Sequence, residues 1–342
     1  MRRVLVTGGT GYIGSHTTVE LITAGYEVVI IDSLMNSRAE VVDAIQQITG
    51  VRPAFFHFDL CDKKELSDFV QKNPFDAVIH FAAFKAVGES VAQPLKYYHN
   101  NLLSLINLLQ VKENLKMVFS SSCSVYGDAE VQPVTEDTPI SKAESPYGNT
   151  KQISEEILRD CCKVNKNLQA ISLRYFNPGG AHETALIGEY PLEAPNNLVP
   201  VITQTAIGKR KEMVVYGGDY NTPDGTCIRD YIHVVDIAKA HVVAVNRLFD
   251  KGQKNYDVFN LGTGHGNSVL EAVKAFEKVA GVKLNYRIGP RREGDVVKVY
   301  ADTVKANKEL GWKAILTIED IMRSAWAWEQ KLNKKEKVIN GI

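Results

Sequence analysis

The first half of the chain alternates short apolar segments with longer segments of mixed polarity. Strands are predicted where the apolar runs are short and rich in β-branched residues, at 4–6, 28–31, 54–58, 76–81, 117–120 and 170–175. The segments between them predict helices over 15–24, 63–71, 101–113 and 147–163. This alternation is typical of an α/β fold with a doubly wound parallel Rossmann sheet and right-handed crossovers.

A glycine-rich turn, Thr7 to Gly14, joins the first strand to the first helix, and the second strand ends at Asp32. This order of strand, turn, helix, strand and acid is the context that a dinucleotide-binding fingerprint requires. The free N–H groups of the helix start favour a pyrophosphate. Asp32 can hold ribose hydroxyls and would repel a 2′-phosphate, which favours NAD over NADP.

Ligands of such sheets bind where the strands end. The carboxyl ends of parallel strands meet at one edge, and a crevice forms outside that edge. The residues at these ends are expected to line one crevice; they are Gly8, Asp32, Asp59, Ala82, Ser122 and Phe176.

The second half of the chain has a different texture, with frequent Gly, Pro and Asn at 191–197 and 217–225. Long loops of this kind predict a smaller, loop-rich C-terminal lobe that binds substrate. Helices are expected at 234–248, at 268–280 and from 316 onward, with the charged segment 331–337 as a solvated helix end. We therefore expect an NAD-binding domain at 1–177 and a substrate lobe at 178–342, with 231–262 returning to the first domain.

Composition narrows the class of protein. The formal net charge is zero, so neither nucleic acid nor an anionic membrane is an expected partner. No apolar run approaches the roughly 18 residues of a membrane span, and the N-terminus enters a strand without a signal-peptide pattern. The five cysteines are unpatterned, which favours reduced thiols and a cytoplasmic location, and no metal-ligand motif is present.

Two helices carry features that the sheet does not require. Tyr147 and Lys151 lie four residues apart and share one helix face, where an ammonium would lower the pKa of the phenol toward that of a general base. Ser122, at the end of the preceding strand, could relay a proton to that phenol. The helix at 101–113 is apolar on more than one side, which indicates either deep burial or a subunit interface.

The chain resembles the UDP-glucose 4-epimerase family of the extended short-chain dehydrogenase/reductases. The glycine turn, the serines before Val125-Tyr126-Gly127, Tyr147 and Lys151 match the wider group. The narrower resemblance covers nearly the whole chain and rests on segments 34–37, 84–90, 174–178, 196–200, 224–233 and 291–295. It implies a homodimer formed through the helices at 101–113 and 147–163.

The resemblance also implies an activity and a set of site residues. UDP-glucose and UDP-galactose would be interconverted by oxidation at sugar carbon 4, rotation of the 4-keto sugar and return of the hydride, with tightly held NAD. The implied catalytic residues are Tyr147 as base, Lys151 and Ser122. The implied NAD site consists of Gly8, Gly11, Tyr12, Ile13, Gly14, Asp32, Ser33, Asn36, Ser37, Asp59, Leu60, Phe81, Ala82, Ala83, Lys85, Asn100, Tyr147, Lys151 and Phe176.

The implied UDP-sugar site draws mostly on the second half of the chain. Its members are Lys85, Ser122, Ser124, Tyr147, Asn177, Asn196, Asn197, Leu198, Val215, Tyr216, Arg229, Arg292, Asp295 and Val299. Two arginines suit a diphosphate, and amide side chains suit a uracil edge or sugar hydroxyls. In the family that the chain resembles, the position of Val299 lies against the 2-substituent of the sugar, so this small residue implies room for an N-acetylated sugar. The alternative is a strand residue packed into the core.

Three rival functions differ from this one in testable ways. A nucleotide-sugar 4,6-dehydratase would carry an Asp-Glu pair after the serines, where this chain has Cys123-Ser124. A non-catalytic NAD-sensing protein has no need for Ser122, Tyr147 and Lys151 together. A dehydrogenase with a dissociable cofactor would release reduced NAD to a coupling enzyme.

Overall fold

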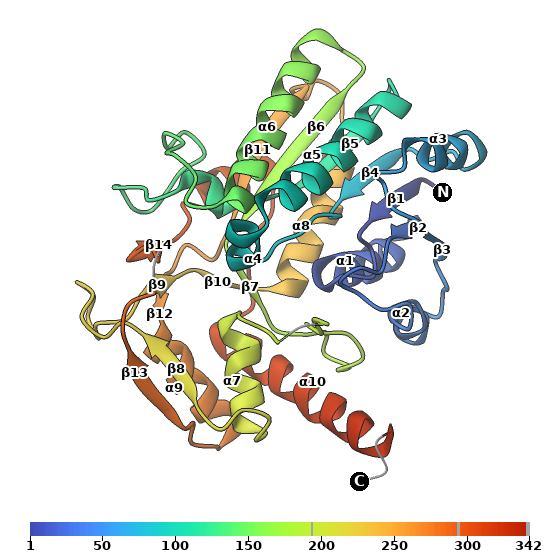
Figure 1. The fold of residues 1–342 in the computed structure, drawn as a ribbon. Coiled ribbons are helices and arrows are strands. Elements are labelled where there is room, and N and C mark those ends of the chain that lie inside the picture. The colour runs from blue at the N-terminus through green and yellow to red at the C-terminus, as the bar shows by residue number, and fades with distance from the viewer. Residues whose placement is uncertain (193, 293–294, 340–342) are drawn as a thin grey trace.

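The computed structural model describes residues 1–192, 194–292 and 295–339, and its centre is a seven-stranded parallel sheet (Figure 1). The strands lie in the order β11-β6-β5-β4-β1-β2-β3. Their bounds are β1 (Arg3–Thr7), β2 (Glu27–Asp32), β3 (Ala54–His57), β4 (Ala77–His80), β5 (Lys116–Ser122), β6 (Gln169–Tyr175) and β11 (Tyr256–Leu261). All six strands predicted from the apolar pattern belong to this sheet, which confirms the predicted fold class.

The seventh strand, β11, is not predicted by the apolar pattern, because Asp257 and Asn260 interrupt its apolar run. Both side chains are buried with partners. The Asp257 carboxylate accepts a hydrogen bond from Lys305 Nζ at 2.7 Å, and Asn260 Nδ2 donates to the Val134 carbonyl at 3.0 Å. Polar residues inside a strand therefore reflect tertiary partners here rather than a solvent-facing edge.

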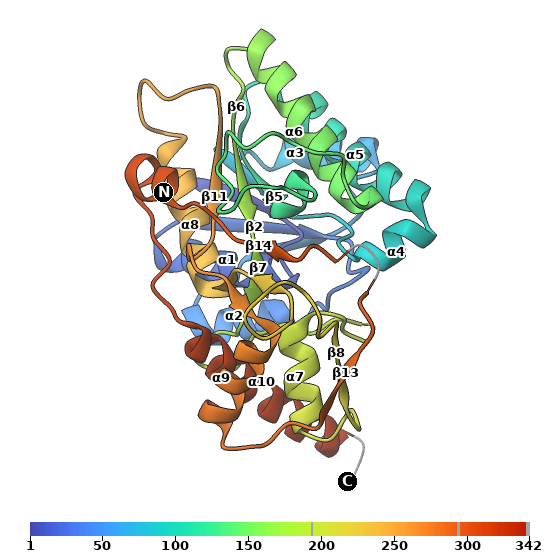
Figure 2. The same ribbon diagram turned by 90° about the vertical axis from the view of Figure 1, so that its left-hand side faces the viewer.

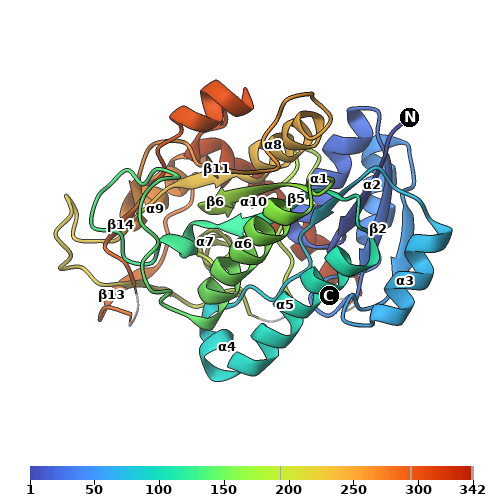
Figure 3. The same cartoon turned by 90° about the horizontal axis from the view of Figure 1, so that it is seen from above.

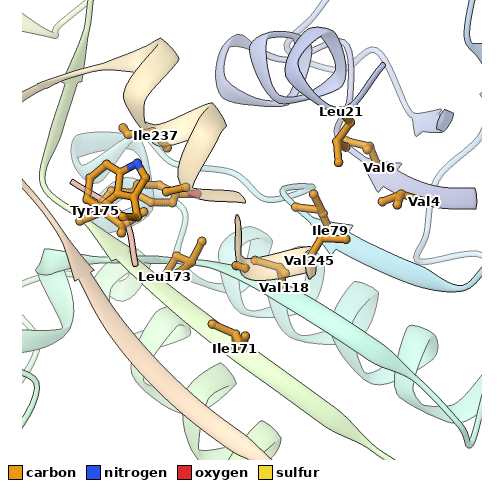
Figure 4. Packing of buried hydrophobic residues seen from close by; sticks show 14 of the residues in the cluster. Val4, Val6, Leu21, Ile79, Val118, Ile171, Leu173, Tyr175, Ile237 and Val245 are labelled. Carbon is orange, nitrogen blue, oxygen red and sulfur yellow. The ribbon is translucent and has the colours of Figure 1, made fainter. Parts of the chain in front are cut away.

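Helices cover both faces of the sheet, as the view from above shows (Figure 3). One layer consists of α1 (Tyr12–Thr23), α2 (Val41–Thr49) and α8 (Val234–Arg247), and the other of α3 (Lys63–Lys72), α5 (Pro94–Val111) and α6 (Pro146–Val164). Successive residues of a strand point to opposite faces of the sheet and pack against the two helix layers in turn. Val4 and Val6 pack with Leu21 and Val245 on the first face (Figure 4), whereas Leu5 packs with Leu105 on the second.

The predicted helices are present, but the starts of α1 and α5 differ from the prediction. Helix α1 begins at Tyr12 rather than at 15. Helix α5 begins at Pro94 rather than at 101. Its first two turns are too polar to give an apolar helix pattern, although Tyr97 within them is fully buried. Leu105 and Leu108 of this helix enter the core, while Leu102, Leu103 and Ile106 stay partly exposed. Deep burial therefore accounts for one side of the helix, and a subunit interface on the other side stays a prediction.

The C-terminal lobe lies beyond the carboxyl edge of the sheet (Figures 1 and 2). Its helices are α7 (Leu198–Ala206), α9 (Val269–Ala280) and α10 (Ile318–Ile339). Its short strands are β7 (Asn177–Gly179), β8 (Met213–Tyr216), β9 (Ile228–Arg229), β10 (Tyr231–His233), β12 (Asn267–Ser268), β13 (Tyr286–Gly289) and β14 (Lys298–Val299). Ile202, Phe276 and Met322 centre a separate apolar core.

Three short elements complete the described chain, namely α4 (Val87–Ala92), η1 (Cys123–Tyr126) and η2 (Ala306–Leu310). Of these, η1 follows the serine end of β5 directly and so lies at the carboxyl edge of the sheet. Within the described residues, no helix is both long and apolar enough to cross a membrane.

Candidate active site

The glycine turn after β1 packs so tightly that side chains are excluded. Gly8 has a φ of +72°, a conformation that glycine adopts readily, and a Cβ there would lie 2.8 Å from the Ala82 backbone nitrogen. A Cβ on Gly14 would overlap the Gly8 carbonyl oxygen. Helix α1 then begins with no side-chain cap and no acidic residue in its first turn. This cradle of bare backbone fits a pyrophosphate, and Gly11, Tyr12 and Ile13 belong to it.

Asp32 ends β2 beside this turn and is held by three hydrogen bonds. Its Oδ1 accepts from the Leu34 amide and from Ser37 Oγ, both at 2.9 Å, and its Oδ2 accepts from the Thr10 amide at 3.1 Å. A carboxylate has about four acceptor positions, so Oδ2 keeps one open for a ribose hydroxyl. Ser33 and Asn36 lie in the same loop after β2.

The remaining predicted cofactor residues follow β3 and β4. Asn107 Nδ2 donates to the Leu60 carbonyl at 2.9 Å, and Asp59 Oδ1 accepts from the Cys61 amide at 2.9 Å, which fixes the chain beyond β3. Phe81, Ala82 and Ala83 follow β4, and the Ala82 backbone lies against Gly8. Asn100 lies on α5, where its Nδ2 donates to Asn101 Oδ1 at 2.9 Å.

The predicted catalytic residues come from the end of β5 and the start of α6. Helix α6 begins at Pro146 after the Ser145 cap, whose hydroxyl accepts from the Gly148 amide at 3.2 Å. Tyr147 therefore lies in the first turn and Lys151 one turn later. Lys151 is 4% exposed, and its Nζ donates to the Ser120 carbonyl at 2.6 Å and lies 5.9 Å from the centre of the Tyr147 ring.

Burial controls the protonation of this pair. It raises the pKa of Tyr147 to about 12, although the Ser122 hydroxyl acts in the opposite direction. It also lowers the pKa of Lys151 to about 8, against the attraction of Glu155. Without ligands the loss of hydration dominates and the net pKa of the phenol rises, while the lowering of that pKa by Lys151 stays a prediction. A further positive charge beside the phenol would lower its pKa toward the range of a general base.

The lobe contributes the charged groups of the predicted substrate site. Asp295 Oδ1 accepts from Arg292 Nη2 at 2.7 Å and lies 3.6 Å from Arg229 Nη2. Glu293 and Gly294 of the same motif lie outside the described residues. Tyr216 is exposed beside Arg292, whose guanidinium lies 5.9 Å from the centre of the Tyr216 ring. The structure thus brings the two arginines together, paired with an acid.

Three of the predicted sugar-side residues lie between the sheet and the lobe. Asn177 is half-buried, and its backbone amide donates to the Asp230 carbonyl at 2.9 Å. Asn197 Nδ2 donates to Glu189 Oε1 at 2.6 Å, and Lys85 Nζ lies 3.4 Å from the same oxygen. Glu189 therefore joins two predicted site residues. Glu189 lies in a loop, and no motif in the sequence marks it as a residue of the site. Asn196 is exposed beside Asn197.

Some apolar members of the predicted site are core residues. The Val215 side chain is 1% exposed and packs with Val199 and Ile202, which leaves its backbone for the predicted substrate contact. Leu198 packs partly against the same core. A strand with alternating inward residues places Val215 inward and Tyr216 outward.

A second apolar cluster lies next to the serines. Phe176 and Val299 are both buried in it, and Cys123 packs against them. Ser124 lies in η1, where its amide donates to Ser122 Oγ at 3.2 Å and its own hydroxyl is buried without a partner among the described residues. Burial raises the pKa of the Cys123 thiol to about 12, so it stays protonated and is unsuited to acid–base work at neutral pH.

Comparison with known proteins gives consistent matches over nearly the full length. A family model described as GDP-mannose 4,6 dehydratase matches residues 5–325. A UDP-glucose 4-epimerase of Dictyostelium discoideum is 51% identical over 334 residues, which cover 97% of this chain and 96% of that protein. A UDP-glucose 4-epimerase of Stenotrophomonas maltophila, solved with bound NAD and formylated UDP-arabinopyranose, superposes with a TM-score of 0.95 at 46% identity, covering 98% of this chain and all of that one.

A further solved structure is similar in fold and in its ligands. A UDP-glucose 4-epimerase of Bifidobacterium longum in complex with NAD⁺ and UDP gives a TM-score of 0.92 at 48% identity. The match covers 96% of this chain and 98% of that one.

Proposed function

The chain belongs to the UDP-glucose 4-epimerase family, and from this premise we propose which of its residues carry the reaction. It interconverts UDP-glucose and UDP-galactose with NAD as cofactor. The observation that carries the proposal is the approach of Tyr147 and Lys151 to the serine end of β5, at the sheet edge where the glycine turn also lies.

The NAD site that we propose is built around the glycine cradle. Its backbone would hold the pyrophosphate, Asp32 would accept hydrogen bonds from the adenosine ribose, and Lys151 would hold the nicotinamide ribose. When bound, NAD supplies the acceptor and donor of the hydride at sugar carbon 4. The fit rests on the exclusion of side chains at Gly8 and Gly14 and on the open acceptor position of Asp32 Oδ2.

Proton transfer in the proposed mechanism belongs to Tyr147 and Ser122. The Tyr147 phenolate oxygen takes the proton of the sugar 4-hydroxyl, directly or through the Ser122 hydroxyl, and returns it in the second half of the cycle. The ammonium of Lys151 favours the phenolate by its charge. Cys123, a protonated thiol where a dehydratase would carry an acid, supports epimerisation over elimination of water.

Inversion at carbon 4 requires the sugar to present both faces, so the diphosphate must be the anchored part of the substrate. Arg229 and Arg292 suit this role because a guanidinium binds phosphate oxygens with two parallel hydrogen bonds. In the ligand-free chain both lie beside Asp295. We propose that the diphosphate takes the place of this carboxylate and that Asn177 and Asn197 contact the sugar or the uracil.

Two finer features are also proposed. Val299 is buried in the apolar cluster that contains Phe176, and its small size supports room for the 2-acetamido group of UDP-N-acetylglucosamine and UDP-N-acetylgalactosamine. The partly exposed Leu102, Leu103 and Ile106 of α5 support a homodimer in which α5 and α6 pair with those of a second copy. The proposed division is residues 1–177 and 178–342 with 231–262 returning to the first domain, and the packing of α8 and β11 with the large sheet supports that return.

The direct test is to supply purified protein with UDP-galactose, without added nucleotide, and to analyse the products by chromatography. We expect UDP-glucose to form. Denatured protein should release NAD or its reduced form, and not NADP. A protein that forms no UDP-glucose with either added nucleotide would contradict the proposed activity, and one that is active only with NADP would contradict the role of Asp32.

A further inference from the structure

A buried ion pair lies behind the proposed catalytic residues and touches none of the proposed ligand positions. Arg174 of β6 and Glu155 of α6 are 2% and 0% exposed. Arg174 Nε donates to Glu155 Oε1 at 2.9 Å, and Arg174 Nη2 donates to Glu155 Oε2 at 2.6 Å. Burying two charges is unfavourable even with such geometry, and a hydrophobic pair of similar volume is often at least as stable. Stability alone therefore gives a weak account of this pair.

The pair is connected to the serine end of β5. Ser121 Oγ donates to Glu155 Oε1 at 2.6 Å, and its neighbours on the strand are Ser120 and the predicted catalytic residue Ser122. Ser120 offers its carbonyl to Lys151 Nζ, and the Ser120 hydroxyl is hydrogen-bonded to that of Tyr175. Glu155 thus fixes the strand segment from which both Lys151 and Ser122 take their positions.

Glu155 also completes a series along one face of α6. Tyr147, Lys151 and Glu155 are spaced four residues apart, so each lies one turn from the next on the face that meets the sheet. The carboxylate is consequently the buried negative charge next to the Lys151 ammonium, and it opposes the effect of burial on the pKa of Lys151. Arg174 lies on the far side of that carboxylate.

On the basis of the proposed function, we infer that the Glu155–Arg174 pair is a positioning device that holds the serine end of β5 against α6 and keeps Lys151 protonated. Arg174 neutralises Glu155 and orients it, and Glu155 acts on the site through Lys151 and Ser121. Neither residue is catalytic, because neither touches the reacting atoms in this scheme.

The other groups around Lys151 do not supply this negative charge. Titratable groups near Lys151 include Tyr147 of α6, His80 of β4 and, through the shared contact with Ser120, Tyr175 of β6. Burial, with the charge of Lys151 adding to it, lowers the pKa of His80 to about 3, so that imidazole is neutral. Burial raises the pKa values of Tyr147 and Tyr175, so both phenols are uncharged in the ligand-free protein.

The test is a titration of Lys151 in the protein as purified, without substrate. Protein labelled with ¹³C at lysine Cε is titrated by NMR, and the Lys151 resonance is identified by its loss in Lys151→Arg. In Glu155→Gln the amide can still accept from Ser121, but the charge is gone and Arg174 repels the ammonium. We expect the Lys151 midpoint to fall by about one unit or more, and the loss of kcat at rising pH to begin correspondingly lower.

Two further variants keep the inference testable. Glu155→Gln combined with Arg174→Met leaves no unpaired charge, so it should fold even if the single variant does not, and its Lys151 midpoint should fall by less than in Glu155→Gln. Tyr126→Phe is the matched control. It removes a hydrogen bond of 3.0 Å from Arg174 Nη1 and one of 2.6 Å to Asn260 Oδ1 without a change of charge, so the midpoint should stay at the wild-type value.

Two outcomes would overturn the inference. One is a Lys151 midpoint equal to that of the wild type in every Glu155 variant that folds. The other is a shift of the Lys151 midpoint in Tyr126→Phe as large as that in Glu155→Gln, which would indicate a general loosening of the core. Because the titration needs no substrate and compares variants with wild type, its result is independent of whether the wild-type protein converts UDP-galactose.

Discussion

The two sides of the proposed active site are built in different ways. The cofactor side is backbone: the turn from Gly8 to Gly14 packs on Ala82, and its form is fixed before any ligand arrives. The substrate side is made of side chains, and its charged members Arg229 and Arg292 pair with Asp295 in the ligand-free chain. The first side should therefore tolerate almost no change, while the second should respond gradually. This difference also suits the chemistry, because the cofactor must stay fixed while the sugar turns over.

The largest effect is expected where the two sides meet, at Tyr147. Tyr147→Phe keeps the ring and its packing but removes the group that exchanges a proton with the sugar. Activity should fall by about 10²–10⁴-fold while NAD stays bound, as measured by turnover and by chromatography of the released cofactor. Tyr256→Phe, which loses only a 3.0 Å contact with Ser172, is the matched control. Near-normal turnover in Tyr147→Phe would remove this residue from the mechanism.

The rigidity of the cofactor side is tested by Gly14→Ala. The new Cβ overlaps the Gly8 carbonyl oxygen, so the turn must open. We expect the loss of retained NAD and a decrease of about 1–3 kcal/mol in the free energy of unfolding, measured by denaturation. Gly88→Ala is the control, since a Cβ there meets nothing within 4 Å on a helix, where alanine is preferred. Retention of NAD at the wild-type level would show that the cradle is not as tight as described.

The substrate side should respond more moderately. Arg292→Ala should raise KM for UDP-galactose by about tenfold to a hundredfold with a smaller change in kcat, because the guanidinium binds the part of the substrate that does not react. The control is Arg287→Ala, which removes an exposed arginine of the nearby strand β13 that pairs with Glu212 at 3.1 Å. This variant should leave KM unchanged. If kcat fell and KM did not, Arg292 would act in the transition state rather than as an anchor.

The smallest effect is a change in selectivity at Val299. Val299→Tyr places a larger side chain in the cluster that contains Phe176. It should reduce the interconversion of the N-acetylated pair by about tenfold or more, while the glucose and galactose pair changes only slightly. Assays of both pairs on wild type and variant decide this. The absence of N-acetyl activity in the wild type, or equal losses on both pairs, would make Val299 a core residue only.

The sequence predicts features that depend on local spacing better than features that depend on contacts between distant parts of the chain. The glycine turn, Asp32 and the pair Tyr147 and Lys151 depend on local spacing, so their arrangement follows from the sequence. Glu155 and Arg174 meet only in the folded sheet, 19 residues apart in the chain, and no local pattern marks them. Strand β11 is missed for a related reason, because partners far away in the chain satisfy Asp257 and Asn260.

The protonation of the site was also beyond the sequence. A spacing of four residues indicates that Lys151 can reach Tyr147, but it does not reveal how far burial shifts the pKa of each group. The phenol pKa of about 12 follows from packing at the sheet edge, which no motif encodes. Resemblance to a family predicts residues for the substrate side, but it does not reveal that the Val215 side chain faces the lobe core.

The central claim is that hydrogen leaves carbon 4 of the sugar and returns to it within one fixed cofactor site. UDP-galactose carrying deuterium at carbon 4 tests it directly, when it is converted in ordinary water with excess unlabelled NAD present. We expect UDP-glucose that retains the deuterium at carbon 4, as read by NMR and mass spectrometry. Loss of the deuterium to solvent, or its appearance in the free nucleotide, would contradict the account.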